Sequence, residues 1–114
     1  MFYLDLFRSL QAAEVRYLVV GGLAMNLHGI PRMTADIDLF LALDDANVRN
    51  FLAVAESFGY APAVPVPPGT LADPAERRRL REEKNLVVLS FRSPAHPAMA
   101  IDVFVDEPVP FGEA

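Results

Sequence analysis

Cysteine is absent from this 114-residue chain, which excludes disulfide scaffolds, thiolate zinc sites and cysteine nucleophiles. Positive charge is scarce, because ten Lys and Arg residues stand against fifteen Asp and Glu, a formal net charge of −5. The chain therefore lacks the overall positive field that draws proteins non-specifically onto nucleic acid. No apolar run reaches the ~18–20 residues of a membrane span, and the first residues, MFYLDLFRSL, lack the layout of a signal peptide. We expect a cytoplasmic protein with no membrane segment.

The composition indicates one folded domain that spans residues 1–114. Chains of about 100–200 residues usually fold around a single core. A content of 53% hydrophobic and 22% charged residues is typical of a folded chain rather than a disordered one. The sequence shows neither internal repeats nor low-complexity tracts.

Hydrophobic spacing and turn residues predict an alternation of helices and strands. The predicted helices cover residues 2–13, 23–28, 45–58 and 73–84, and the predicted strands cover 16–20, 35–43, 85–91 and 99–105. Asp44 or Asp45 can cap the third of these helices. Because only a short connection that contains RSPAHP joins the last two strands, those strands are expected to pair antiparallel. This order predicts an α/β (α+β) fold, a small mixed sheet with helices packed on it.

Prolines are concentrated at residues 61–69, which hold four of the ten in the chain. We expect a stiff, extended loop there, without regular structure. The helix that follows begins with a capping-box pattern, in which Asp73 is the cap, Pro74 the first helical residue and Glu76 the third.

The same helix carries half of the positive charge, at Arg77, Arg78, Arg79, Arg81 and Lys84. Glutamates interleave with these cations, so the run is interpreted first as a solvated helix face. The alternative is that it guides a polyphosphate or an RNA end. In that case Arg77 and Arg81, four residues apart, would share the face that does so.

Two carboxylates stand two residues apart in the predicted strand 35–43. Asp36 and Asp38 therefore point to one face, while their apolar neighbours point to the core. Two carboxylates about 4 Å apart repel by roughly 4 kcal/mol at an effective dielectric near 20, so a fold that keeps them offers a cation, a shared proton or open water. Asp102 stands likewise within an apolar run, IDVFV. If the two strands are neighbours, three carboxylates converge, and such hard oxygen ligands suit Mg²⁺ or Mn²⁺ better than zinc.

A glycine pair, Gly21-Gly22, separates the first predicted strand from the short helix 23–28. Two glycines let the backbone turn sharply and approach a ligand closely. The N–H groups at the start of the following helix can then receive a phosphate. A phosphate cradle beside a carboxylate cluster is what metal-assisted phosphoryl transfer requires. The alternative for the glycines is a simple tight turn. The alternative for the two acids is that they face solvent at the end of an edge strand.

The string LVVGGLAMNLHGIPRMTADIDLFLAL resembles the core of the nucleotidyltransferase (DNA polymerase β-like) superfamily. That superfamily combines an apolar strand, a Gly-Gly or Gly-Ser turn, a short helix, an Asp-x-Asp or Asp-x-Glu strand and a third Asp on a later strand. The chain is most similar to small bacterial nucleotidyltransferase-like proteins that include the AbiEii-type toxins. Their GG…HG…R-x-T-x-D-I-D string stands here as Gly21-Gly22, His28-Gly29, Arg32, Thr34 and Asp36-Ile37-Asp38. The resemblance covers about residues 15–113.

The resemblance implies a nucleotidyltransferase fold and transfer of a nucleoside monophosphate from a nucleoside triphosphate to a hydroxyl acceptor. Asp36 and Asp38 would hold divalent ions, Mg²⁺ or Mn²⁺, and Asp102 would complete the metal site and take the acceptor's proton. Gly21 and Gly22 would cradle phosphates. Among relatives the acceptors include tRNA ends and partner proteins, and toxin–antitoxin pairing is common. An RNA or protein acceptor and an antitoxin or toxin partner are therefore expected.

Two further motif residues are candidate nucleotide-binding residues. Arg32 either contacts substrate phosphate or neutralises the neighbouring acids, and Thr34 hydrogen-bonds the loop that enters the acidic strand. Many relatives continue into helices beyond the third acid, and a domain that lacks this C-terminal extension is one hypothesis for the chain. The alternative function is a catalytically silent nucleotide-binding or protein-interaction module of the same fold.

Overall fold

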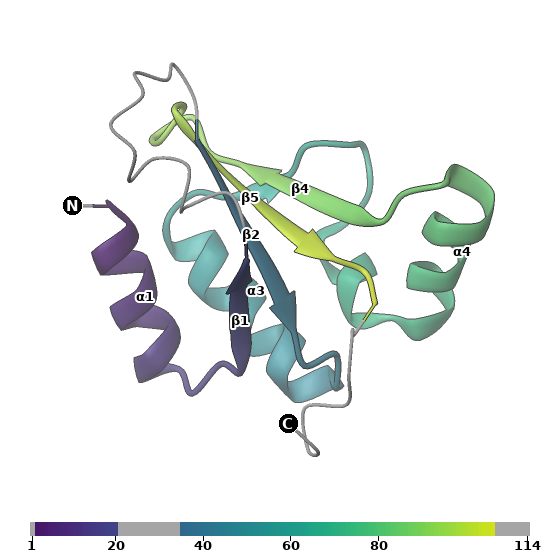
Figure 1. Cartoon of the computed structure of the whole chain (residues 1–114), viewed down its shortest axis with the longest axis horizontal. Coiled ribbons are helices and arrows are strands. Elements are labelled where there is room, and N and C mark those ends of the chain that lie inside the picture. The colour runs from purple at the N-terminus through teal and green to yellow at the C-terminus, as the bar shows by residue number, and fades with distance from the viewer. Residues whose placement is uncertain (1, 21–34, 107–114) are drawn as a thin grey trace.

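Five strands form one mixed sheet in the order β1-β2-β5-β4-β3 (Figure 1). The computed structural model describes residues 2–20 and 35–106. The elements are α1 (Phe2–Ala12), β1 (Tyr17–Val20), β2 (Ala35–Leu41), α3 (Asp45–Ser57), β3 (Ala61–Pro62), the 3₁₀ helix η1 (Pro68–Ala72), α4 (Pro74–Lys84), β4 (Val88–Arg92) and β5 (Met99–Phe104). β2 and β5 are parallel, whereas the β1–β2, β4–β5 and β3–β4 pairs are antiparallel. The predicted mixed sheet and the antiparallel pairing of the last two strands are confirmed. The predicted helix 23–28 lies outside the described residues.

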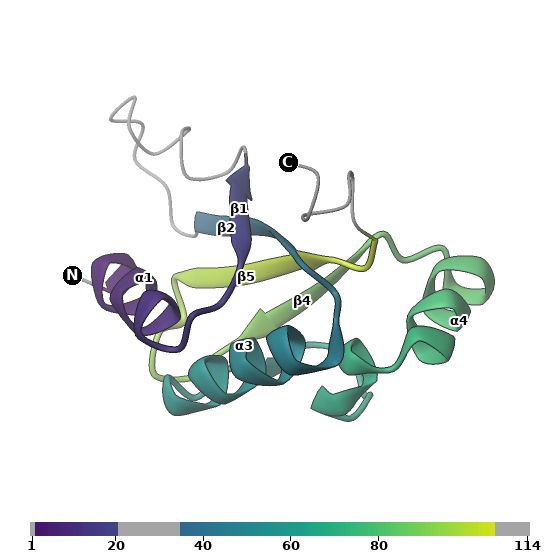
Figure 2. The ribbon, with the colours of Figure 1, turned by 90° about the horizontal axis from the view of Figure 1, so that it is seen from below.

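The core fills one face of this sheet, beneath α1 and α3 (Figure 2). Alternate residues of each central strand point into it, as the period of a half-buried strand requires. Phe51 of α3 meets Phe91 of β4 edge to face, with ring centroids 5.7 Å apart. The largest side chains of this core that are fully buried include Leu6, Leu10, Ile37, Leu39, Leu41, Phe51, Leu71, Leu89, Phe91 and Ile101. The opposite face holds the half-buried alternate residues of β2, β4 and β5.

Both predicted helix caps are present. Asp44 caps α3 and accepts a hydrogen bond from the backbone N–H of Asn47 (3.1 Å), and Asp73 caps α4 with Pro74 as its first residue. The reciprocal half of the predicted capping box is wrong. Glu76 pairs with Arg79 (2.7 Å) instead, and the N–H of Asp73 donates to the carbonyl of Thr70 (3.2 Å). The 3₁₀ turn before α4 has already supplied an acceptor for that N–H, so the Glu76 side chain is not needed there.

The proline-rich segment is more regular than predicted. Ala61 and Pro62 form the edge strand β3 against β4, and η1 begins at Pro68. Proline is tolerated in an edge strand because its missing N–H removes no ladder bond on the outer side. The loop expectation for residues 61–69 therefore holds only between these two short elements.

The start of β5 is fixed by Tyr60, which follows α3. Its hydroxyl donates to the carbonyl of Met99, the first residue of β5, at 2.9 Å. Burial raises the pKa of Tyr60 to about 12, so the phenol stays a neutral donor across the physiological range.

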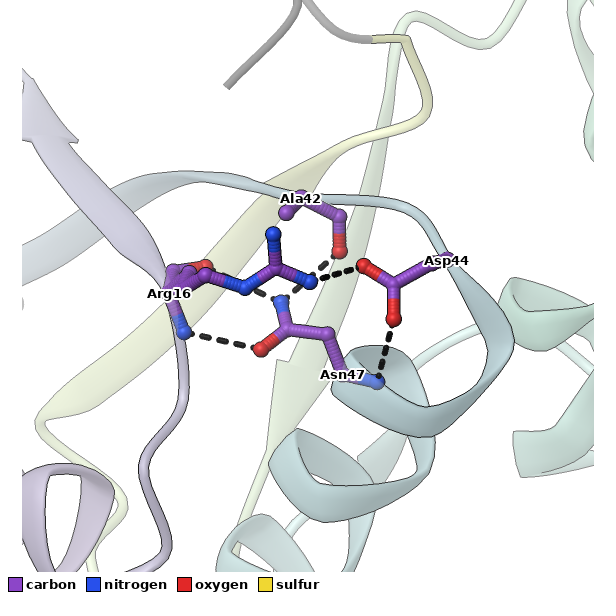
Figure 3. A network of polar contacts seen from close by, with 4 residues as sticks. All are labelled: Arg16, Ala42, Asp44 and Asn47. Atoms are coloured by element: carbon purple, nitrogen blue, oxygen red, sulfur yellow. Dashed lines mark hydrogen bonds and ion pairs between the residues drawn. The ribbon is translucent and has the colours of Figure 1, made fainter. Parts of the chain in front are cut away.

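One buried amide joins α3 to the two strands that precede it (Figure 3). The side chain of Asn47 accepts from the N–H of Arg16 (2.8 Å) and donates to the carbonyls of Arg16 (3.0 Å) and Ala42 (2.7 Å). Asn47 is 3% exposed, so water has little access to take its place as the hydrogen-bond partner of these backbone groups. The Arg16 guanidinium adds an exposed ion pair with the cap residue Asp44.

We expect the Asn47→Ala variant to lower the free energy of unfolding by about 3 kcal/mol, because it removes three hydrogen bonds worth about 1 kcal/mol each. Urea unfolding followed by circular dichroism measures the loss. Asn50→Ala, the same substitution on the exposed side of α3, is the matched control and should change stability little. Equal losses in the two variants would contradict the bridging role of Asn47.

Candidate active site

The acidic strand is β2, and its alternation separates the core from the candidate site. Ile37, Leu39 and Leu41 are 0% exposed beneath α1 and α3. Asp38 is half-buried and lies in the opposite phase, on the face that carries no core residue of β2. The predicted division of β2 into an apolar face and a face that carries Asp38 is confirmed.

β5 brings the second acid beside it. In the parallel β2–β5 pair, Asp38 and Asp102 are register partners, flanked by Ile37 opposite Ile101 and Leu39 opposite Val103. Neighbouring strands lie about 4.8 Å apart, so the two acidic residues are separated by one strand spacing. The sequence left open whether these two strands were neighbours, and the structure shows that they are.

Asp36 takes part in the same strand pair one step earlier, where its register partner is Ala100. Its side chain lies outside what the structure describes. Among the side chains of residues 2–20 and 35–106 that are described, no group of three or more His, Cys, Asp and Glu is placed to hold a metal ion. The convergence of all three predicted acids therefore stays a prediction, supported at the Asp38–Asp102 pair.

Ser90 is a residue that the sequence reasoning missed. It is the register partner of Asp102 on the other side, in β4, and its hydroxyl donates a hydrogen bond to Oδ1 of Asp102. Asp38, Asp102 and Ser90 thus form one row across β2, β5 and β4. The only sequence signal for Ser90 is its place between Leu89 and Phe91, which are buried in the core phase of β4.

The predicted phosphate-binding residues Gly21, Gly22, Arg32 and Thr34 lie outside the described residues. The strand that leads to the glycines does reach the candidate site, because Val20, the last residue of β1, is the register partner of Asp38. The Gly-Gly pair therefore follows in sequence directly after a residue that lies beside the acidic row.

Two phenylalanines form the next row on this face. Phe40 and Phe104 each follow an acid of the pair by two residues, and their rings stack with centroids 4.0 Å apart. Leu18 of β1 is paired with Phe40 and is 46% exposed. The strand alternation that sets Asp38 and Asp102 on this half-buried face sets the two rings there as well.

A groove of about 780 Å³ lies between α4 and the carboxyl ends of β2 and β5. Arg77, Arg78 and Arg81 line it together with Asp106, which follows β5. The prediction that Arg77 and Arg81 share a face is confirmed. Both cations also have partners, since Arg81 forms an ion pair with Asp106 and Arg77 donates to the carbonyl of Leu71 (2.7 Å). For Arg78 no ion pair is found within residues 2–20 and 35–106.

A mixed sheet covered by helices on one face, with acids of two adjacent parallel strands on the other, is consistent with a nucleotidyltransferase-like fold. The chain belongs to the AbiEii family: the family model described as "Nucleotidyl transferase AbiEii toxin, Type IV TA system" matches residues 4–114. This confirms the predicted family and enzyme class, and it makes the chain a nucleotidyltransferase of a toxin–antitoxin system. Such a family implies in general a nucleoside triphosphate, a divalent metal and an antitoxin. No curated protein and no solved structure matches the chain.

Within the described part of the chain, no helix is both long enough and apolar enough to cross a membrane.

The acid pair generates a prediction about stability. We expect the Asp102→Asn variant to raise the free energy of unfolding by about 1 kcal/mol in metal-free buffer, because one of two like charges a strand apart is removed. The full repulsion at an effective dielectric of 20 would be about 4 kcal/mol at 4 Å, and the half-exposed position of both residues reduces it. Urea unfolding in the presence of EDTA measures the change.

Neutralisation of an exposed carboxylate on α3, Glu56→Gln, is the matched control and should shift stability by less than about 0.5 kcal/mol. A loss of stability in Asp102→Asn that exceeds the control would show that the Asp38–Asp102 pair is not under mutual repulsion.

Proposed function

We propose that the chain transfers a nucleoside monophosphate from a nucleoside triphosphate to a hydroxyl acceptor, with Asp36, Asp38 and Asp102 as the acids that hold Mg²⁺ or Mn²⁺. The observation that carries this proposal is the register of β2 and β5, which pairs Asp38 with Asp102 across one strand spacing. The donor chemistry fits the ion, because carboxylate oxygens are the protein ligands that Mg²⁺ and Mn²⁺ prefer. A cation between the two acids also offsets their mutual repulsion.

The bound ion would supply charge neutralisation at the phosphates and at the attacking oxygen. Asp36 and Asp38 would hold the ion from β2, and Asp102 would hold it from β5. The acceptor oxygen forms a bond to the α-phosphorus, the bond from that phosphorus to the bridging oxygen of the leaving pyrophosphate breaks, and Asp102 accepts the hydroxyl proton. Gly21 and Gly22, which follow Val20 beside Asp38, receive the terminal phosphates through backbone N–H groups. Arg32 and Thr34 contribute further phosphate contacts.

We expect Asp38→Asn and Asp102→Asn each to lower the rate of transfer by at least ~100-fold, since each removes a charged ligand and Asp102→Asn also removes the proton acceptor. The measurement is release of pyrophosphate from ATP, CTP, GTP and UTP with Mg²⁺ or Mn²⁺. Glu56→Gln is the control that keeps full activity. A wild-type protein that binds a nucleotide but releases no pyrophosphate with RNA or protein acceptors would favour the silent binding module instead.

For the acceptor we propose an RNA end rather than a protein hydroxyl. The supporting observation is the groove that follows Asp102 along β5, lined by three arginines. Asp106 stands four residues beyond Asp102, so at ~3.3 Å per residue the groove begins no more than about 13 Å from that acid. Arginine is the side chain best suited to phosphate contacts of this kind.

We expect Arg78→Ala to weaken labelling of RNA by about tenfold at physiological salt. The slope of log affinity for RNA against log salt concentration should fall by about one, the value for one lost phosphate contact. The Michaelis constant for the nucleotide should stay unchanged. The assay follows α-labelled nucleoside triphosphate into total RNA and total protein from a bacterial extract. Arg49→Ala is the control, because Arg49 lies on the exposed side of α3 and pairs with Asp45. Label that enters only protein, or an Arg78→Ala variant that labels RNA as the wild type does, would overturn the RNA acceptor.

A further inference from the structure

The hydroxyl of Ser90 contacts one oxygen of the carboxylate that the proposed reaction needs in a defined orientation. The contact is a hydrogen bond from Ser90 Oγ to Oδ1 of Asp102. Hydrogen bonds to an ionised carboxylate are stronger and more directional than those between neutral groups. An unrestrained Asp side chain populates several staggered rotamers, so a bond of this kind selects one of them.

Ser90 is itself held in place by its backbone. β4 pairs antiparallel with β5 in the register that sets Ser90 opposite Asp102. On the other side of β4, the carbonyl of Ser90 accepts the N–H of Ala63 at 2.8 Å. The donor is therefore fixed on a strand with neighbours on both sides, rather than on a loop.

Asp102 thus lies between two register partners with different chemistry. Asp38 of β2 brings a second negative charge on one side, and Ser90 of β4 brings a hydroxyl donor on the other. With one lone pair of Oδ1 engaged by Ser90, Oδ2 is the oxygen that remains for an ion shared with Asp38, and a second lone pair of Oδ1 stays open to the acceptor's proton. The row Asp38–Asp102–Ser90 combines two ligands with a donor that orients one of them.

We propose that Ser90 is a positioning residue, which fixes the Asp102 carboxylate for binding of the divalent ion. This inference rests on the proposed function, because it needs Asp102 to be a metal ligand. Groups that hydrogen-bond to ligating carboxylates orient the ligands, and their loss typically lowers metal affinity by about 10–100-fold. Ser90 does not itself contact substrate or metal in this assignment.

The test is a titration of the full chain with Mn²⁺ alone, in which electron paramagnetic resonance measures the free ion. We expect Ser90→Ala to raise the Mn²⁺ dissociation constant about tenfold. Ser90→Thr keeps a hydroxyl in a residue that strands favour, and it should stay within about twofold of wild type. Ser57→Ala is the matched control, since it also removes a serine hydroxyl, one that donates to the carbonyl of Val54 in α3 (2.6 Å).

Thermal unfolding of each metal-free variant separates a general loss of structure from a loss of metal affinity. In the transfer assay, Ser90→Ala should raise the Mn²⁺ concentration needed for half-maximal activity, while the rate at saturating Mn²⁺ stays near that of wild type. If the role of Ser90 were purely structural, Ser90→Ala would lower stability without a selective rise in the Mn²⁺ concentration needed for activity, and Ser90→Thr would not restore Mn²⁺ binding.

Two negative outcomes are distinguishable. If Asp38→Asn and Asp102→Asn weaken Mn²⁺ binding while Ser90→Ala binds as the wild type does, the positioning role of Ser90 is wrong and the proposed function stands. If neither acid variant changes Mn²⁺ binding, the metal site itself is wrong, and the role of Ser90 is overturned with it.

Discussion

The parallel pairing of β2 with β5 is the constraint on which the candidate site depends. These strands are separated by more than fifty residues of sequence, and both are buried on the core face, where Ile37 and Leu39 lie opposite Ile101 and Val103. A slip of one residue would move the buried set to the open face, so burial of these side chains fixes the register. The same register that satisfies the core sets Asp38 beside Asp102. The free energy gained by burying the core side chains therefore offsets the repulsion between these two carboxylates.

The two faces of the sheet differ in chemistry and in burial. The face beneath α1 and α3 is apolar and is buried along β2, β4 and β5. The other face carries the row Asp38–Asp102–Ser90, followed by the stacked pair Phe40–Phe104. An acid beside an apolar core is costly to bury, whereas on a half-exposed face its charge stays available to a ligand. This arrangement holds Asp38, Asp102 and Ser90 at fixed positions on the half-buried face of the sheet.

The charged groove lies at the end of the same strands, between α4 and the carboxyl ends of β2 and β5. Its arginines are interspersed with acids, and the ion pair between Arg81 and Asp106 joins α4 to the end of β5. The net charge of −5 for the whole chain agrees with this mixed pattern. Any attraction for a polyanion is therefore local to the groove rather than a property of the whole surface.

The sequence by itself determined the elements and the family. Periodicity and capping residues placed α1, α3, α4 and the strands β1, β2, β4 and β5 within a few residues, but not β3, and the Gly-Gly and Asp-x-Asp motifs pointed to the AbiEii family that the comparison shows. These signals are local, since one turn, one cap or one strand phase produces each. Only the tertiary structure decided that β5 lies between β2 and β4, that Ser90 donates to Asp102, and that Phe40 stacks on Phe104. Strand order and register join residues far apart in the chain, and they are set by how the whole core packs.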